Sequence, residues 1–410
     1  MPPHHPSLEG SLLRRESEVV LARHSPFGAP APHSEAVADL PPHATLAAVD
    51  ALLARHPDAI ESRPNKLLAA LGEFVAANEK PATSPNFATG AADDVRAIAP
   101  LLRAALDGNS EVHERLCEML LRAFKILSRK VPNRLPLGSR TLPAICAALA
   151  SPPSERAASE AANTLLNVCY EADCVAQALR HGALSPLVSM LASARPELQA
   201  TAAGAIQSIA YQKAGREAAN DAGAAELLVP LLDDTEPHVA ARAVGAVHNL
   251  SSDVRAIGPL REVGAIAPLV RLLRANAAGP CASAAGALQN LAREPLARAE
   301  LQRLGAAVPL TDLLYANDEG CRHCAVGALL NLIGPDLGEE TDANATRVLF
   351  KRVLGMAVAL GELHARTAPN APGDVSWLPT KPGGGACSAR VTAAAALPGR
   401  PSEAARPGAT

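Results

Sequence analysis

Apolar residues in the middle of the chain fall at helical spacing, and the spacing repeats. Residues 269–273 place leucine or valine at i, i+3 and i+4, and an alanine-rich stretch follows at 284–291. Such spacing puts the apolar side chains on one face of a helix. The pattern predicts three helices in each unit, which we number in chain order. A short first helix, such as 295–304, precedes a glycine, a short second helix follows the glycine, and a long third helix closes the unit.

Two residue types mark the period of this pattern. Glycine stands between the first and second helices, where a left-handed backbone ends a helix, and asparagine stands near the end of the third helix. Each series recurs at a spacing of 41 residues: Gly182, Gly223, Gly264 and Gly305, and then Asn167, Ser208, Asn249, Asn290 and Asn331. A fixed period of this size is typical of a solenoid, in which each unit buries its apolar face only against its neighbours.

Prolines fall at defined places in the second helices. Pro186, Pro268 and Pro309 each stand four residues after the glycine, where a missing N–H costs nothing at a helix start. In the unit that begins with Gly223 the proline is displaced to Pro230. We therefore expect the second helix of that unit to bend.

The sequence GAIAPLVRLL at residues 264–273, followed by ASAAGALQNLA at 282–292, resembles the armadillo repeat. The resemblance covers residues 95–333 and implies an all-α, right-handed superhelical solenoid. It also implies a non-catalytic scaffold or adaptor that binds an extended or helical partner segment in a concave groove lined by the third helices. The alternative is a structural or assembly subunit of a larger complex, for example ciliary or cytoskeletal, held by its convex face and tails.

Within this family the chain departs from importin α, which pairs the asparagine near the end of each third helix with a tryptophan one turn earlier. Here the five positions one turn earlier hold Asn163, Gly204, Gly245, Gly286 and Gly327. The one tryptophan of the chain, Trp377, lies outside the repeats. Without aromatic walls there are no slots for the stems of lysine side chains. The sequence therefore argues against a nuclear-import receptor.

The remaining segments give the expected organisation. Residues 1–43 form a largely disordered arm, and residues 44–90 form a helical cap and linker with helices at 45–60 and 65–78. About six repeats with the period of 41 occupy residues 91–334. A capping helix within 335–367 and a disordered tail at 368–410 complete the chain.

The candidate binding residues follow from the third helices, because side chains one turn apart share a helix face. An asparagine amide can bond to both the N–H and the C=O of an extended peptide, although the same amides could instead brace neighbouring repeats. Tyr170 and Tyr211 could anchor a partner or pack on the next loop, and Arg242 and Arg293 could bind a carboxylate or phosphate or simply be solvated. The full set of candidate groove residues is Asn167, Tyr170, Gln207, Tyr211, Arg242, His248, Asn249, Gln289, Asn290, Arg293 and Asn331.

Glycine inside a helix needs an explanation, because it costs roughly 0.5–1 kcal/mol relative to alanine. The four mid-helix glycines Gly204, Gly245, Gly286 and Gly327 share one register position. They could allow close packing between helices, or they could leave an open floor for a bulky ligand. We favour close packing.

Composition narrows the function classes. A net charge of -3 and a pI near 6.5 argue against a nucleic-acid partner, and no apolar run reaches the roughly 18 residues that a membrane helix needs. Eight cysteines without disulfide-type spacing indicate a reducing intracellular compartment, which is the cytoplasm or, as the alternative, the nucleus.

No catalytic motif is present, so we expect no enzyme, no cofactor and no small-molecule substrate. The motif Cys321-x-x-Cys324, with Cys281 one repeat earlier, invites a zinc interpretation. Cysteine is also a small apolar residue suited to tight helix packing, and we favour that interpretation. The expected partners are therefore one or more proteins.

Overall fold

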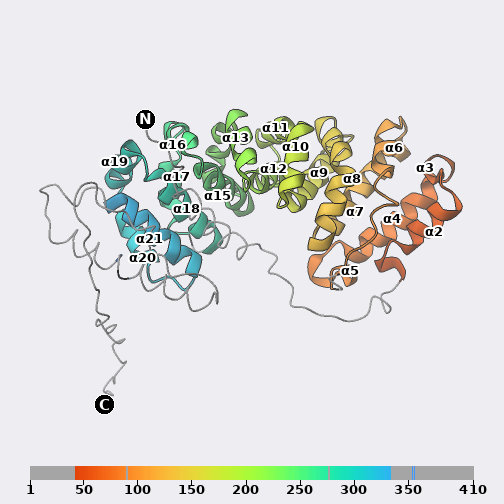
Figure 1. The fold of residues 1–410 in the computed structure, drawn as a ribbon, viewed down its shortest axis with the longest axis horizontal. Coiled ribbons are helices and arrows are strands. Elements are labelled where there is room, and N and C mark those ends of the chain that lie inside the picture. Colours follow the sequence, from red (N-terminus) through yellow and green to blue (C-terminus); the bar gives the residue numbers. More distant parts are fainter. Residues whose placement is uncertain (1–41, 89–90, 276–277, 334–352, 354, 356–410) are drawn as a thin grey trace, which may run out of the picture. The chain divides into compact units, whose positions relative to one another are not determined.

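The computed structural model describes residues 42–88, 91–275 and 278–333, together with residues 353 and 355, and every regular element within them is a helix (Figure 1). This confirms the all-α class. The greater part of the predicted arm at 1–43, the predicted C-terminal helix apart from those two residues, and the predicted tail at 368–410 lie outside the described residues.

A group of short helices precedes the repeats. Its elements are η2 (Pro42–Ala44), α2 (Ala47–Arg55), α3 (Ala59–Ser62), α4 (Pro64–Asn78), η3 (Pro81–Thr83) and α5 (Pro85–Ala88). The prediction of one helix at 45–60 was wrong, because the chain breaks between α2 and α3. Pro57 disfavours helical backbone at the preceding residue, and His56 is indeed outside the helical region, with φ -140° and ψ 82°.

The repeats follow as sets of helices in the predicted order. The first set has α6 (Leu101–Asp107) and α7 (Glu111–Ser128), and in the second set the first two helices are fused into one long helix, α8 (Val131–Ala150), ahead of α9 (Glu155–Val168). The later sets are α10 (Ala172–Arg180), α11 (Leu184–Leu191) and α12 (Pro196–Ile209); α13 (Lys213–Asp221), α14 (Ala224–Leu228), η4 (Pro230–Asp233) and α15 (Pro237–Ser251); α16 (Val254–Glu262), α17 (Ile266–Leu272) and α18 (Ala278–Leu291); and α19 (Pro295–Arg303), α20 (Ala307–Leu313) and α21 (Glu319–Ile333).

Glycine ends each first helix as the sequence predicts. Gly182 and Gly264 have φ of 72° and 88°, and Gly223 and Gly305 are also left-handed. The N–H after the glycine donates back across the turn, for example from Ala183 to the carbonyl of Ala178 at 3.0 Å. This is the Schellman arrangement, which satisfies carbonyls that a helix end leaves without partners.

The displaced proline also acts as expected. Helix α14 stops at Leu228, and the chain continues as the 3-10 helix η4 from Pro230. In the other three units Pro186, Pro268 and Pro309 lie in the first turn of their second helices, two residues inside the observed starts. A first-turn N–H has no partner within the helix, so proline is tolerated there.

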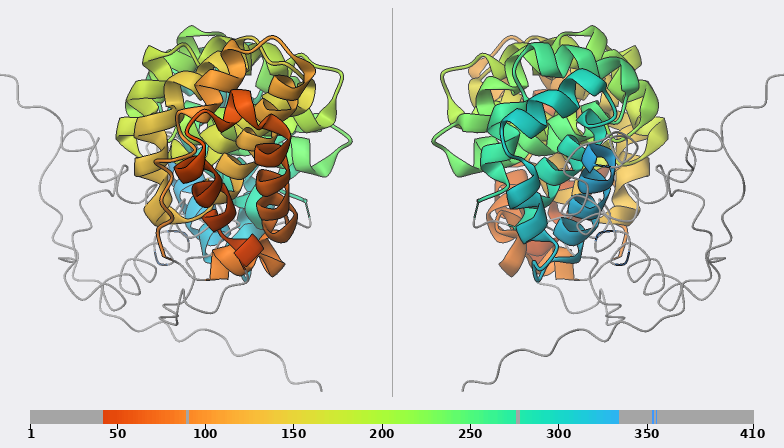
Figure 2. Two further views of the ribbon diagram at one scale, coloured as in Figure 1. Left: turned by 90° about the vertical axis from the view of Figure 1, so that its right-hand side faces the viewer. Right: turned by 90° about the vertical axis from the view of Figure 1, so that its left-hand side faces the viewer.

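The third helices form the continuous core of the stack. Helix α4 packs on α7, and then α7, α9, α12, α15, α18 and α21 each pack on the next. Figure 2 shows the end formed by α2–α4 and, from the opposite side, the end formed by α19–α21. Buried alanines such as Ala203, Ala246 and Ala287 let neighbouring helices approach closely. The row of third helices therefore carries the same register position past each repeat in turn.

Candidate functional site

The residues near the C-terminal ends of the third helices give the candidate site. We call the residues at positions 167, 208, 249, 290 and 331 the ladder positions. Together with the side chains seven, four and one residues before them and three after them, they define the third-helix face. These offsets correspond to whole helical turns or adjacent positions, so the side chains project from one side of each helix.

Each ladder asparagine donates its amide N–H to the end of the preceding third helix. The bonds run from Nδ2 of Asn167 to Ser128 Oγ (2.9 Å), Asn249 to the Gln207 carbonyl (2.7 Å), Asn290 to Ser251 Oγ (3.0 Å) and Asn331 to the Gln289 carbonyl (2.9 Å). The asparagines therefore brace neighbouring repeats, which is one of the two roles that the sequence left open. Two of these bonds satisfy carbonyls at a helix end, where intrahelical partners are missing.

The amide oxygens of the ladder are used differently from the nitrogens. Within the described residues no donor reaches the Oδ1 atoms of Asn167, Asn249 and Asn290, and none of these atoms is buried without a partner. They are therefore in contact with solvent. An amide oxygen held in this way is a fixed acceptor that can receive an N–H from outside the chain.

The mid-helix glycines provide notches for side chains of the preceding repeat. A Cβ atom added at each glycine would collide with the residue just before the ladder position one repeat earlier. The pairs are Gly204 with Leu166, Gly245 with Gln207, Gly286 with His248, and Gly327 with Gln289. Close packing, the explanation favoured from the sequence, is therefore confirmed. Three predicted groove residues, Gln207, His248 and Gln289, lie over these notches.

His248 is the most enclosed of the three. It is only 9% exposed, and its Nδ1 atom is buried without a hydrogen-bond partner in the described residues. Burial lowers its pKa from 6.5 to about 4, because the low-dielectric surroundings disfavour the charged form. At neutral pH His248 therefore fills space as an uncharged ring, while Gln207 and Gln289 remain partly exposed.

Tyr170 and Tyr211 meet at the C-terminal ends of α9 and α12. Their ring centroids are 6.5 Å apart and the planes are tilted by 59°, which is a favourable aromatic arrangement. The guanidinium carbon of Arg134 lies 5.1 Å from the centroid of Tyr170, within the range of a cation–π contact. Both tyrosines are half-buried.

Arg242 approaches the same region from α15. A Cβ atom at Gly204 would lie 3.3 Å from its Cδ and 3.5 Å from its Nε, so the arginine stem crosses the Gly204 notch. Burial lowers the pKa of Arg242 and the neighbouring Tyr170 partly offsets this. Within the described residues Arg242 has neither an ion pair nor a hydrogen bond from its side chain. Arg293 is exposed, and no ion pair involves it within the same part of the chain.

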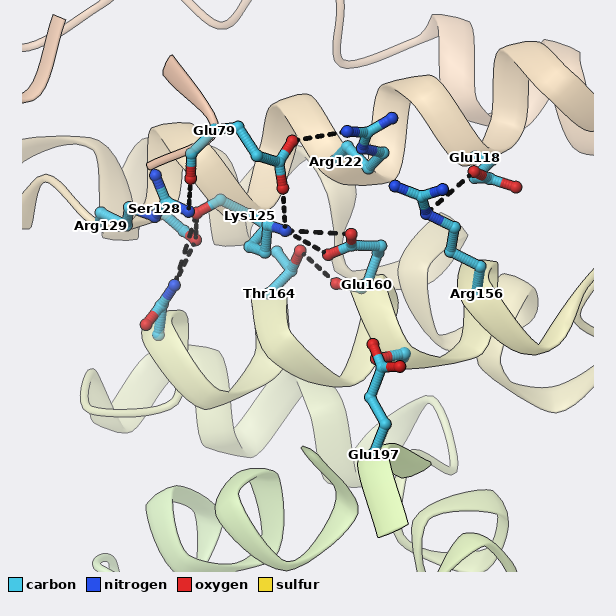
Figure 3. A network of polar contacts seen from close by, with 12 residues as sticks. Glu79, Glu118, Arg122, Lys125, Ser128, Arg129, Arg156, Glu160, Thr164 and Glu197 are labelled. Carbon is cyan, nitrogen blue, oxygen red and sulfur yellow. Dashed lines mark hydrogen bonds and ion pairs between the residues drawn. The ribbon is translucent and has the colours of Figure 1, made fainter. Parts of the chain in front are cut away.

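Cations at the other end of this face are neutralised (Figure 3). Arg122 and Lys125 on α7 bond to Glu79 at 2.6 and 3.1 Å, and Lys125 also bonds to Glu160 of α9 at 2.9 Å. Burial alone would raise the pKa of Glu79, but the hydrogen bonds from Arg122 and Lys125 outweigh it and lower the pKa. The Arg129 guanidinium donates to the carbonyl of Asn78, at the end of α4.

Comparison with known proteins identifies the repeat. The model of the armadillo/β-catenin-like repeat matches residues 172–211, the span of α10, α11 and α12. A designed armadillo repeat protein superposes with a TM-score of 0.51 at 26% identity, over 57% of this chain and 99% of that chain. Residues 172–211 thus form an armadillo repeat, and the described residues share the armadillo-repeat fold.

Two further solved structures extend the likeness. Computationally designed armadillo repeat proteins for modular peptide recognition give a TM-score of 0.50 at 26% identity, covering 57% of this chain and 99% of theirs. An engineered protein gives a TM-score of 0.56 at 24% identity, over 69% of this chain and 66% of that chain, and shows the fold alone. No curated protein gives a significant match.

The armadillo register explains which site residues the sequence missed. Arg134 lies on α8, outside the third helices, so the ladder gave no signal for its contact with Tyr170. Glu79 lies just after α4, before the repeats begin. Arg122 and Lys125 do occupy the register, four and one residues before Ile126, and could have been found by extending the ladder one repeat toward the N-terminus.

The cysteines of the last armadillo repeats pack together. Cys281 of α18 and Cys321 of α21 belong to one buried cluster, and each thiol donates to a backbone carbonyl at 3.3 Å, of Leu273 and Ala278 respectively. When Cys281 is ionised, its sulfur can instead accept the Cys321 proton, and this hydrogen bond lowers the pKa of Cys281. Among the described residues no three potential ligands converge on a metal position. The same residues include no helix that is both long and apolar enough to span a bilayer.

Proposed function

We propose that this armadillo-repeat protein is a non-catalytic scaffold that binds an extended segment of a partner protein along the third-helix face. The observation that carries the proposal is the series of amide oxygens on Asn167, Asn249 and Asn290, each without a donor in the described residues. The backbone N–H groups of an extended peptide have no partners within the peptide, so they are available to donate to these oxygens.

The spacing of the ladder suits such a segment. Packed helices are about 8–10 Å apart, and an extended chain advances ~3.3 Å per residue. One repeat therefore corresponds to about two or three residues of a bound peptide. Contacts made through the peptide backbone place few demands on its sequence, so specificity depends on the side chains that flank the ladder.

The bracing bonds favour binding rather than oppose it. Each amide is held by its own N–H bond to the preceding repeat, so its oxygen does not have to be ordered when a peptide arrives. Preorganisation of this kind reduces the entropic cost of association. The fold likeness to proteins designed for modular peptide recognition supports the same use of this face.

The partner class follows from the same surface. We propose a protein partner, with no nucleic acid, membrane insertion or small-molecule substrate, in the cytoplasm or nucleus. The seven cysteines within the described residues are free thiols, and free thiols are typical of a reducing compartment.

The test is a selection of random 12-residue peptides displayed on phage against the full-length protein. Selected peptides are resynthesised with a photo-crosslinking benzoylphenylalanine, and mass spectrometry locates the crosslinks. We expect crosslinks on α9, α12, α15 and α18. Asparagine variants are unsuitable as a test because they also remove the bracing bonds.

Matched charge reversals complete the test. Arg293→Glu alters an exposed residue of the third-helix face, whereas Arg303→Glu alters an exposed residue of the first helix α19. The first should change the affinity of the selected peptides, and the second should not. Failure to select any peptide, or crosslinks confined to first and second helices, would refute the proposal and favour an assembly subunit held by its other surfaces.

A further inference from the structure

The centre of the third-helix face has a charge pattern that its N-terminal end lacks. At seven residues before the ladder position, α9 carries Glu160, α12 carries Thr201 and α15 carries Arg242. Glu160 is only 6% exposed and is held by Lys125 at 2.9 Å. The register position therefore changes from a paired anion to a cation over two repeats, and no acidic side chain in the described residues pairs with that cation.

Three consecutive third helices position the Arg242 side chain. It starts on α15 and its stem crosses α12 at Gly204, where the Leu166 side chain of α9 also enters the notch. A Cβ atom at Gly204 would lie 2.6 Å from Leu166 Cδ1 and 3.3 Å from Arg242 Cδ. Because the notch is filled from both sides, the arginine stem has little room to move. The guanidinium therefore occupies a defined place near the end of α9.

An aromatic wall lies beside this place. Tyr170 follows Leu166 by four residues at the end of α9, and Leu166 shares the Gly204 notch with Arg242. Tyr211, whose ring is 6.5 Å from that of Tyr170, extends the wall. Arg134 contacts the ring of Tyr170, and its Nε donates to the carbonyl of Ser128 at 3.3 Å. Arg134 is thus committed to the scaffold, whereas Arg242 is free to bind.

A partly buried guanidinium without an anion is unfavourable, since desolvation is not offset by pairing. A carboxylate accepts two parallel N–H bonds from a guanidinium group. The two tyrosine rings can cover the methylene groups that carry this carboxylate. A lysine or arginine of a partner would meet like charge at the same place.

We propose that Tyr170, Tyr211 and Arg242 form a subsite for a carboxylate side chain, glutamate or aspartate, of the bound segment. This inference rests on the proposed function and specifies the charge of its ligand. Arg242 binds the carboxylate through its guanidinium, and the tyrosines contact the methylene groups next to it. The partner segment is accordingly acidic at this step of the ladder, which is the opposite of a basic import signal.

The experiment uses four oriented libraries of 12-residue peptides that differ only at the central position, which is fixed as glutamate, glutamine, lysine or phosphoserine. Retention on the full-length protein is compared by mass spectrometry for the wild type, Arg242→Met and Arg271→Met. Arg271 is the control, because it is an exposed arginine of α17 that pairs with Asp233 away from the third-helix face. Photo-crosslinking locates the bound peptides, as above.

We expect the wild type to retain the glutamate library about tenfold more than the glutamine library, as a hydrogen-bonded charge pair implies. Arg242→Met should abolish this preference, and Arg271→Met should preserve it. Arg242→Lys, which keeps the charge but loses the fork, should give an intermediate preference. Removing an unpaired, partly buried charge should leave the melting temperature of Arg242→Met at or above that of the wild type, so that lost binding is not confused with unfolding.

The outcomes separate the two proposals. Equal retention of glutamate and glutamine libraries, with crosslinks still on the third helices, would overturn the carboxylate subsite and leave the scaffold function in place. Preferential retention of lysine would do the same. Much stronger retention of phosphoserine than of glutamate would overturn the assignment of a carboxylate. If none of the libraries binds, both proposals fail.

Discussion

The glycine notches make a quantitative prediction when two of them are compared. Gly286→Ala adds a methyl group 2.6 Å from Cε1 of His248, a rigid and enclosed ring. Gly245→Ala adds the same group against the amide end of Gln207, which is flexible and partly exposed. Both changes gain roughly 0.5–1 kcal/mol of helix propensity. Only the first forces a buried side chain to move, at a cost of roughly 1–3 kcal/mol.

We therefore expect Gly286→Ala to lose about 1–2 kcal/mol of unfolding free energy and Gly245→Ala to gain up to ~1 kcal/mol. Thermal unfolding followed by circular dichroism would show the first as a fall in midpoint of about 2–4 °C for each kcal/mol lost. A double-mutant cycle with His248→Ala provides the control, because the methyl group then has room. In that background Gly286→Ala should be neutral or stabilising.

Two results would contradict the expected effect of Gly286→Ala. If Gly286→Ala is as stable as the wild type, the ring does not constrain the notch. If the loss persists unchanged in the His248→Ala background, the methyl group collides with something other than His248.

Three further predictions follow from buried groups. The pKa of His248 is about 6.5 in the unfolded chain and about 4 in the folded protein. Lowering the pH from 6.5 to 4 should therefore reduce the unfolding free energy by up to about 3 kcal/mol relative to His248→Leu, measured by urea unfolding at each pH. Parallel pH profiles for the two proteins would contradict this. Asn249→Ala leaves the Gln207 carbonyl without its donor and should cost about 1 kcal/mol by the same measurement, whereas an unchanged urea midpoint would show that the brace is not stabilising. Burial raises the pKa of Cys117, next to Glu118, and of Cys146 to about 12. Maleimide at pH 8 should therefore label these two cysteines only after urea is added. Rapid labelling of either one in the native protein would refute the stated burial.

Periodicity was enough to predict the repeat, its three-helix order and the left-handed glycines, because each depends on residues close together in sequence. The break between α2 and α3 depends on Pro57, and a signal for it was present in the sequence. The fusion of two helices into α8 is different, since that helix continues through Pro136 and Pro143. Proline usually interrupts a helix, and here packing against α9 and α10 accompanies its continuation.

The residues that share the third-helix face were predictable to the same extent. The register identified the residues of the third-helix face, and the contact between Tyr170 and Tyr211 follows from their equivalent positions. It could not show that asparagine N–H groups are used internally, because an amide suits a peptide and a helix end equally well. Nor could it show which cations are neutralised, because Glu79 and Lys125 are separated in sequence and meet only in the fold.

The two contacts between successive third helices point in opposite directions along the chain. The ladder asparagine reaches back to the repeat before it, while the residue just ahead of that asparagine enters the notch of the repeat after it. The three junctions from α12 to α21 are thus each completed by one residue from each side, at fixed places in the register. A whole repeat could be duplicated or removed without designing a new junction, provided that the flanking repeats supply the matching pair. The length of the binding surface can therefore change independently of the chemistry at any one step.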